Sequence, residues 1–152
     1  MESNPSPNPI DILLVEDNAG DVFLFKSSLG QSQVPHILHQ VDDGEAAMAF
    51  LYQQAEYSDA PRPHLVVLDL NLPRKDGREV LAELKADPVL KKIPVIVMTG
   101  STAKQDILKS YELSANCYIT KPTALRDFKG VVQSLEEFWL HHVQLPTLGA
   151  GS

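Results

Sequence analysis

The sequence predicts an α/β protein with a parallel sheet covered by helices on both faces. Five short runs rich in Ile, Val and Leu recur along the 152-residue chain, and longer stretches with helical spacing of apolar residues separate them. The two kinds of segment alternate strictly, which is the pattern of right-handed strand–helix–strand crossovers. Because the strand runs are almost continuously apolar, we expect the sheet to be buried on both sides.

The strands are expected where the apolar runs are too short to be helices. The first run begins at Ile10, after a segment in which Pro5, Pro7 and Pro9 prevent regular backbone hydrogen bonding. The five predicted strands cover residues 10–15, 35–41, 65–68, 94–98 and 117–119.

Between the strands, apolar residues recur three and four positions apart, as in helices that pack on a sheet. Residues 53–64 lack this period and contain Pro61 and Pro63, so we expect an unusually long surface loop there. The predicted helices cover residues 22–29, 45–52, 78–85, 104–113 and 123–142.

Composition and length are those of one compact domain. The chain has 20 acidic and 13 basic side chains, a formal net charge of −7, and a single cysteine that cannot form an internal disulfide. The acidic balance argues against a nucleic-acid partner, since phosphate binding depends on Lys and Arg. No apolar run approaches the roughly 20 residues of a membrane span, so no membrane association is expected.

We expect three parts along the chain: a flexible segment over residues 1–9, a domain over residues 10–143 and a tail over residues 144–152. About ten residues follow the last predicted helix, which leaves no room for a DNA-binding or enzymatic output domain. We therefore expect a stand-alone domain that acts through its contacts with partners.

Polar side chains follow four of the predicted strands, at the edge where open parallel sheets bind their ligands. Glu16 and Asp17 follow the first strand, Asp69 the third, Thr99 the fourth and Lys121 the fifth. Three crowded carboxylates repel one another unless a hard cation offsets their charge, and Mg²⁺ also leaves positions open for phosphoryl oxygens. The sequence therefore predicts a Mg²⁺ site at this edge.

Each of these residues also has an ordinary structural explanation. An acidic pair after a strand often begins a helix, and Asn18 is a suitable helix cap. An aspartate at a strand end is common in turns, and a threonine there follows from its strand propensity. Their coincidence at one edge of the sheet favours a binding site.

Four segments, in this order, resemble the receiver domains of bacterial two-component response regulators. They are Leu-Leu-Val-Glu-Asp-Asn at 13–18, Val-Leu-Asp-Leu-Asn-Leu-Pro at 67–73 with Gly77, Val-Met-Thr-Gly at 97–100 and Tyr-Ile-Thr-Lys-Pro at 118–122. The resemblance covers about residues 10–140. It implies the flavodoxin-like receiver fold, with a five-stranded parallel sheet in the order 2-1-3-4-5.

The resemblance also implies a chemical role for the acidic residues. Asp69 is the implied phosphoacceptor, and Glu16, Asp17, Asp69 and the main-chain carbonyl of Asn71 are the implied ligands of Mg²⁺. A carboxylate attacks phosphorus readily when charge on the transferred group is offset, so an aspartyl phosphate forms without an added base. We therefore expect a switch that catalyses only its own phosphorylation and slow dephosphorylation.

Residues after the last two strands are implied to respond to the phosphoryl group. Thr99 would donate a hydrogen bond to it, and Lys121 would supply a positive charge. Tyr118 lies where receivers carry an aromatic switch, which is expected to rotate inward as Thr99 moves; a half-buried strand tyrosine is the ordinary alternative. Gly100 opens the site to water, which predicts unhindered but slow self-hydrolysis.

Three further segments resemble the small response regulators that serve cyanobacterial phytochromes: Pro-Arg-Pro at 61–63, residues 93–101, and Glu-Phe-Trp-Leu at 137–140 with Leu-Pro at 145–146. That resemblance implies a sensor histidine kinase, a bacterial phytochrome, as phosphodonor, and a cytoplasmic location. It also implies a homodimer through the last helix, where we expect Phe138, Trp139 and Leu140 to form an exposed patch. Core packing is the ordinary explanation for the earlier apolar residues of that helix.

Other functions remain as alternatives from the residues alone. A Mg²⁺-dependent phosphatase of the haloacid dehalogenase type also uses a strand-end Asp and a Lys, but it needs a second Asp where this chain has Asn71. A flavodoxin would hold a flavin phosphate where Glu16 and Asp17 lie, and these carboxylates would repel it. A static receiver-like scaffold is disfavoured because every residue of the acceptor site is present.

Overall fold

The computed structural model describes residues 8–148 of the chain. Strands and helices alternate through this part as the apolar periods predict. The elements are β1 (Ile10–Val15), α1 (Ala19–Leu29), β2 (His36–Val41), α2 (Gly44–Leu51), η1 (Ala55–Tyr57), β3 (Leu65–Leu68), α3 (Gly77–Ala86), η2 (Leu90–Lys92), β4 (Val95–Thr99), α4 (Lys104–Glu112), β5 (Cys117–Thr120), α5 (Leu125–Leu135) and η3 (Glu136–His142).

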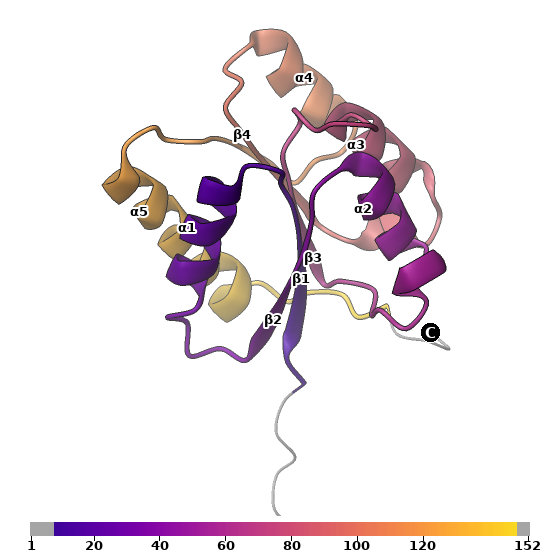
Figure 1. Ribbon diagram of the computed structural model, residues 1–152, viewed down its shortest axis with the longest axis horizontal. Helices are drawn as coiled ribbons and strands as arrows, with labels where there is room; N and C mark the ends of the chain where they lie inside the picture. Colours follow the sequence, from indigo (N-terminus) through magenta and orange to yellow (C-terminus); the bar gives the residue numbers. More distant parts are fainter. Residues whose placement is uncertain (1–7, 149–152) are drawn as a thin grey trace, which may run out of the picture.

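The five strands form one sheet in the order β2-β1-β3-β4-β5, and every neighbouring pair is parallel. Helices α1 and α5 cover one face, while α2, α3 and α4 lie along the other (Figure 1). The predicted sheet, its strand order and its two helical layers are therefore confirmed. Because all strands run the same way, their carboxyl ends lie at one edge.

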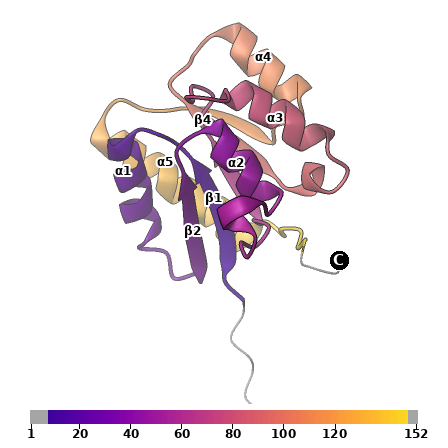
Figure 2. The same ribbon diagram turned by 45° about the vertical axis from the view of Figure 1, so that its right-hand side comes forward.

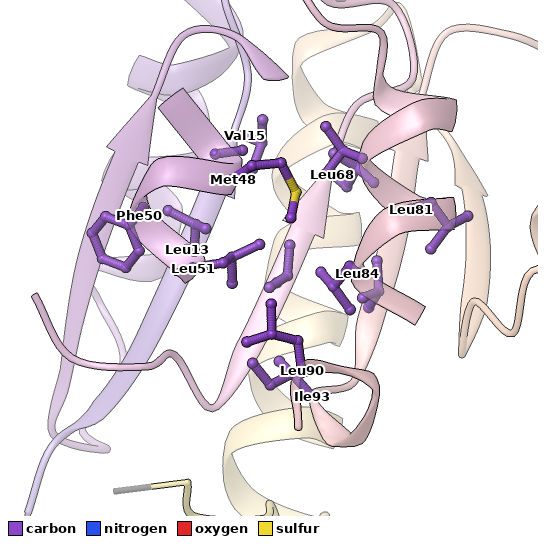
Figure 3. Packing of buried hydrophobic residues seen from close by; sticks show 14 of the residues in the cluster. Leu13, Val15, Met48, Phe50, Leu51, Leu68, Leu81, Leu84, Leu90 and Ile93 are labelled. Atoms are coloured by element: carbon purple, nitrogen blue, oxygen red, sulfur yellow. The ribbon is translucent and has the colours of Figure 1, made fainter. Parts of the chain in front are cut away.

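Strand β1 shows why the strand runs are apolar throughout. Leu13 and Val15 pack on the face covered by α2 and α3, whereas Ile12 and Leu14 pack on the face of α1 and α5. Figure 3 shows the first of these clusters, where side chains of the sheet, α2 and α3 meet. Burial on both faces holds the site-bearing ends of the strands in a rigid frame.

Helix α1 begins three residues before its apolar period predicts. Asn18 caps it, because its side-chain oxygen accepts a hydrogen bond from the backbone N–H of Asp21 at 2.9 Å. A capping box between Asp76 and Glu79 begins α3 in a similar way. First turns held by polar caps carry few apolar residues, so apolar spacing alone places these helix starts too late.

The last helix is not the single regular helix predicted over residues 123–142. It is α-helical only in α5 and continues as the π-helical segment η3, in which the backbone N–H of Val143 donates to the carbonyl of Phe138 at 3.1 Å. A π turn is wider than an α turn and changes which side chains face the core. Leu140 is 8% exposed and packs with Ile12 and Phe25, so the prediction that it belongs to an exposed patch is wrong. Phe138 is 56% exposed.

Helix α4 is held more loosely than its neighbours and lies beside α3 at the end of the layer (Figure 2). Ser110 is its only buried residue, while Leu108 and Tyr111 face solvent. The Tyr111 hydroxyl accepts a hydrogen bond from the backbone N–H of Tyr118, on the edge strand β5, at 3.2 Å. These contacts leave α4 attached mainly through its ends and through β5.

The predicted long connection over residues 53–64 contains one short helical turn, η1. Residues 1–7 of the predicted flexible segment and residues 149–152 of the predicted tail lie outside the described part of the chain. Within the described part of the tail, Leu148 packs against the core cluster of α2 and α3. No helix between residues 8 and 148 combines the length and apolarity that a bilayer crossing needs.

Candidate functional site

The carboxyl ends of four strands bring the predicted site residues together. Glu16 and Asp17 come directly after β1, Asp69 directly after β3, Thr99 ends β4 and Lys121 follows β5. One carboxylate oxygen from each of the three acidic residues lies within 4.8 Å of the other two. The carboxyl ends of these strands thus bring three carboxylates, a hydroxyl and an ammonium group into one small region.

Both carboxylate oxygens of Asp69 accept hydrogen bonds. The Thr99 hydroxyl donates to Oδ1 at 2.7 Å, the backbone N–H of Asn71 donates to the same oxygen at 3.1 Å, and the Lys121 ammonium donates to Oδ2 at 2.8 Å. Burial raises the pKa of Asp69, but these donors outweigh burial and hold that pKa below its usual value. The carboxylate is therefore ionised at neutral pH although it is only 6% exposed.

Lys121 is the positive centre of the site. Its ammonium contacts the carboxylates of Glu16, Asp21 and Asp69, the last two at 2.9 and 2.8 Å. Burial lowers the pKa of Lys121, but the three carboxylates raise it well above its usual value. Lys121 therefore stays charged, and Asp21 fixes it from the first turn of α1.

Glu16 is buried without full compensation of its charge. The pKa of Glu16 is raised to about 7: burial is the main cause and the nearby Asp69 adds to it, while hydrogen bonds from Lys121 and the backbone N–H of Asn18 act in the opposite direction. A buried glutamate beside two further carboxylates fits a hard divalent cation, which prefers oxygen ligands.

The start of α3 packs directly against the backbone that carries the Asp69 carboxylate. A Cβ atom at Gly77 would lie 2.2 Å from the carbonyl oxygen of Asp69 and 2.6 Å from Cα of Leu70. The Gly77 N–H also donates to the Leu70 carbonyl at 2.9 Å. Glycine is required here by close backbone approach, and the contact fixes Asp69 relative to α3.

Tyr118 lies outside the carboxylate cluster but contacts the turn that follows Thr99. Its hydroxyl donates to the carbonyl of Ser101 at 2.9 Å, and its ring is half-buried. Tyr118 therefore points toward the turn between β4 and α4. Its rotation in response to phosphorylation stays a prediction.

Three charged residues near the site were missed by reasoning from strand ends. Asp21 contacts Lys121, and Arg78 donates to both carboxylate oxygens of Asp106, each at 2.8 Å. Asp21, Arg78 and Asp106 all lie in first turns of helices, where polar residues are ordinarily read as helix-terminal charges or solvent-facing groups. These residues could have been found from the sequence, because the first turns that carry them follow the same strand ends as the predicted site residues.

Comparison with known proteins identifies the family. A family model described as the response regulator receiver domain matches residues 12–133. The chain belongs to this family. Response regulator Rcp1 of Synechocystis sp. is 54% identical over 145 residues, which cover 95% of this chain and 97% of that protein.

Two solved structures of receiver proteins are close in shape. The Mn²⁺-bound form of response regulator Rcp1 has a TM-score of 0.90 at 54% identity and covers 91% of this chain and 100% of its own. The phosphorylated cyanobacterial phytochrome response regulator RcpA has a TM-score of 0.90 at 51% identity, over 92% of this chain and 100% of its own. The resemblance to receivers, and to those of cyanobacterial phytochrome pathways, is confirmed, and nothing supports the phosphatase or scaffold alternatives.

Proposed function

We propose that Asp69 of this response regulator accepts a phosphoryl group from a sensor histidine kinase, in a reaction that depends on a divalent cation. The observation that carries the proposal is the setting of Asp69: an ionised carboxylate between the donors Thr99 and Lys121, with the Glu16 and Asp17 carboxylates beside it. This set combines a nucleophile, groups for phosphoryl oxygens and ligands for a cation. The chain then acts only on its own phosphorylation and dephosphorylation.

In the proposed reaction, one Asp69 oxygen attacks the phosphorus of a phosphohistidine. The phosphorus–nitrogen bond breaks, its electron pair stays on the imidazole of the donor, and an aspartyl phosphate remains. In this proposal Lys121 offsets charge on the phosphoryl oxygens and Thr99 donates a hydrogen bond from its hydroxyl to one of them, which is supported by the contacts of both side chains with Asp69. Asp21 keeps the Lys121 ammonium in position during the exchange of partners.

The cation is proposed to be Mg²⁺, held by Glu16, Asp17, Asp69 and the main-chain carbonyl of Asn71. When bound, it offsets the negative charge of the transferred group. Three clustered carboxylates support this assignment, as does the binding of Mn²⁺ by the relative Rcp1. Both ions accept such oxygen-rich ligand sets.

The phosphodonor is proposed to be a bacterial phytochrome, which also places the chain in the cytoplasm. Support comes from RcpA, a phytochrome response regulator at 51% identity. Two exposed apolar side chains lie close in the sequence to site residues: Phe23, two residues after Asp21 on α1, and Leu125, four residues after Lys121 at the start of α5. A kinase that delivers its phosphohistidine to Asp69 would cover both.

A labelling experiment with acetyl phosphate tests the acceptor. We expect Mg²⁺-dependent phosphorylation of the wild type, none of Asp69→Asn, and normal labelling of Asp59→Asn, which replaces an exposed aspartate of the 53–64 loop. Equal labelling of wild type and Asp69→Asn would overturn the proposal. Labelling that persists in excess chelator would overturn its metal requirement.

Transfer from a radiolabelled cyanobacterial phytochrome kinase tests the donor. We expect Phe23→Ala to slow transfer from the kinase while its labelling by acetyl phosphate stays normal, because the small donor needs no docking surface. Equal slowing with both donors would show that Phe23 acts on the site itself. Transfer that Phe23→Ala leaves unchanged would remove this surface from the proposal.

The chain is further proposed to form a homodimer through the last helix. Phe138 is exposed and meets Trp139 edge to face at 5.7 Å between ring centroids, beside a shallow groove over Gly130 and Val131. Leu140 is excluded from this surface by its burial. Sedimentation should show a dimer that Trp139→Ala weakens and that the exposed control Phe23→Ala leaves intact; an unchanged dimer in Trp139→Ala would rule out this face.

A further inference from the structure

A network of polar contacts outside the acceptor site joins the first turns of α3 and α4 to the switch residues. Arg78 donates from Nε and Nη2 to the two carboxylate oxygens of Asp106, each at 2.8 Å. Asp106 also accepts from the Ser101 hydroxyl at 2.6 Å, and the Ser101 carbonyl accepts from Tyr118. Ser101 lies two residues after Thr99, so the backbone through Gly100 connects the network to the threonine whose hydroxyl contacts Asp69.

The other end of the network also returns to the acceptor. Arg78 donates from Nη1 to the carboxylate of Asp76 at 3.0 Å and to the carbonyl of Leu70, next to Asp69, at 3.4 Å. Helix α3 is firmly fixed, because its first residue packs against the Asp69 backbone. The contacts therefore form a ring that leaves Asp69 through Leu70 and returns to it through Thr99.

The ring passes through the least buried helix of the layer. Helix α4 has no side-chain cap at its start, and Ser110 is its only buried residue. The apolar core therefore does little to fix its first turn, whereas the bidentate pair of Arg78 and Asp106 ties that turn to α3. The pair also sets where the turn between β4 and α4 lies.

We propose that Arg78, acting through Asp106, is a positioning residue for phosphorylation of Asp69. The pair holds Ser101, and with it the Thr99 hydroxyl, in place before the phosphoryl group arrives. A donor that is already placed needs no reorganisation when charge develops on the phosphoryl oxygens. The same contacts hold Tyr118 toward the turn. This inference rests on the proposed function of Asp69.

Phosphorylation by acetyl phosphate at saturating Mg²⁺ tests the inference. We expect Arg78→Met and Asp106→Asn each to lower the phosphorylation rate constant about fivefold, and the double variant to be no slower than either one, because both changes open the same ring. The rate constant of Arg78→Lys should lie between those of the wild type and Arg78→Met, since lysine keeps the charge but loses the planar two-point contact. The matched control is Glu83→Gln, which removes the ion pair between Glu83 of α3 and Lys75, away from Arg78.

Binding of Mn²⁺, followed by the electron spin resonance of the free ion, separates positioning from general damage. The acidic ligands Glu16, Asp17 and Asp69 lie outside the Arg78–Asp106 pair, so the Mn²⁺ affinity of the variants should stay near that of the wild type. A wild-type rate in Arg78→Met, Asp106→Asn and Arg78→Lys would overturn the inference. So would a loss of Mn²⁺ affinity as large as the loss of rate. If the wild type itself is not labelled, the proposed function fails instead.

A fluorine label on the tyrosines supplies a readout of the switch. In protein containing 3-fluorotyrosine, the Tyr118 resonance is assigned by its absence in Tyr118→Phe. We expect the Tyr118 resonance to move in Arg78→Met and Asp106→Asn but not in Glu83→Gln. The resonances of Tyr52 and Tyr57 should stay in place in Arg78→Met and Asp106→Asn. A Tyr118 resonance that does not move in Arg78→Met would contradict the connection through Ser101.

Discussion

Helices α3 and α4 lie on the same face of the sheet, yet they are held in opposite ways. Helix α3 begins with a capping box and buries Val80, Leu81 and Leu84 in the core. Helix α4 has no side-chain cap and buries only Ser110, so polar contacts at its start take the place of an apolar face. Asp69 is fixed to the firmly packed helix, and Thr99 leads into the loosely held one.

This difference gives the two halves of the site different tasks. Under the proposed function, Asp69 must keep its place through many cycles of phosphorylation, whereas the turn after Thr99 is expected to change its contacts in each cycle. Elements that move in switching are drawn from the least stable parts of a fold. Substitutions in the two helices and hydrogen exchange can show whether α3 and α4 divide these tasks as their packing indicates.

The largest expected effect comes from trimming one leucine on each helix. Leu84→Ala on α3 should lower the free energy of unfolding by about 3 kcal/mol, because it leaves a cavity in a closed core. Leu108→Ala on α4 should change it by less than about 0.5 kcal/mol, since that side chain is 66% exposed. Urea unfolding followed by circular dichroism measures both. Similar losses in the two variants would break the comparison.

Alanine substitutions of the glycines on the two sides of the site should show the same contrast, with a large loss of stability on the α3 side and almost none on the α4 side. Gly77→Ala forces a Cβ atom onto the Asp69 backbone and should cost about 2 kcal/mol of unfolding free energy. Gly100→Ala, where the Cβ atom meets nothing within 4 Å, should leave stability nearly unchanged and lengthen the life of the phosphorylated form about twofold by hindering water. A phosphorylated wild type that decays only with an added phosphatase would contradict the predicted self-hydrolysis.

Hydrogen exchange compares the two helices without any substitution. Amides in the middle of α4 should exchange more than about tenfold faster than those in the middle of α3, because α4 can open without exposing the core. Arg78→Met should speed exchange in the first half of α4 and leave α3 almost unchanged. Equal protection of the two helices in the wild type would mean that α4 is held by more than its polar contacts.

The smallest expected effect is a pH dependence that the cation ligands have and the α4 contacts lack. Burial raises the pKa of Glu16 to about 7, whereas hydrogen bonds from Arg78 and Ser101 lower that of Asp106 to about 2. Below pH 7 a bound cation must displace a proton from Glu16, so Mn²⁺ affinity should fall about threefold from pH 7.5 to 6.5. Glu16→Gln should bind more weakly with a flatter pH profile, and the Tyr118 fluorine resonance should not move over this range. A pH-independent Mn²⁺ affinity in the wild type would contradict the raised pKa of Glu16.

The fold and the core of the site could be predicted because both follow from local patterns. Apolar periods located the strands, and the rule that parallel strands end at one edge gathered Glu16, Asp17, Asp69, Thr99 and Lys121. Apolar spacing missed helix starts that depend on polar caps such as Asn18.

Long-range side-chain pairs and irregular helix geometry could not be predicted from local sequence patterns. The pair of Arg78 and Asp106 joins residues 28 positions apart in first turns that carry no apolar signal. The burial of Leu140 depends on the π turns of η3, because a regular helix would place side chains on different faces. The sequence predicted which chemistry gathers at the sheet edge, but not which contacts hold the turn between β4 and α4.

The hydrogen bond between Tyr111 and the outer strand has a consequence for self-association. Strand β5 ends the sheet, and its free backbone groups are a template on which a strand of another molecule can pair. The Tyr111 hydroxyl accepts the hydrogen bond of the Tyr118 N–H, so the least buried helix of the layer also shields the open edge of the sheet. A displacement of α4 large enough to free that N–H would expose a site for strand addition, which makes the seating of one tyrosine a safeguard against aggregation.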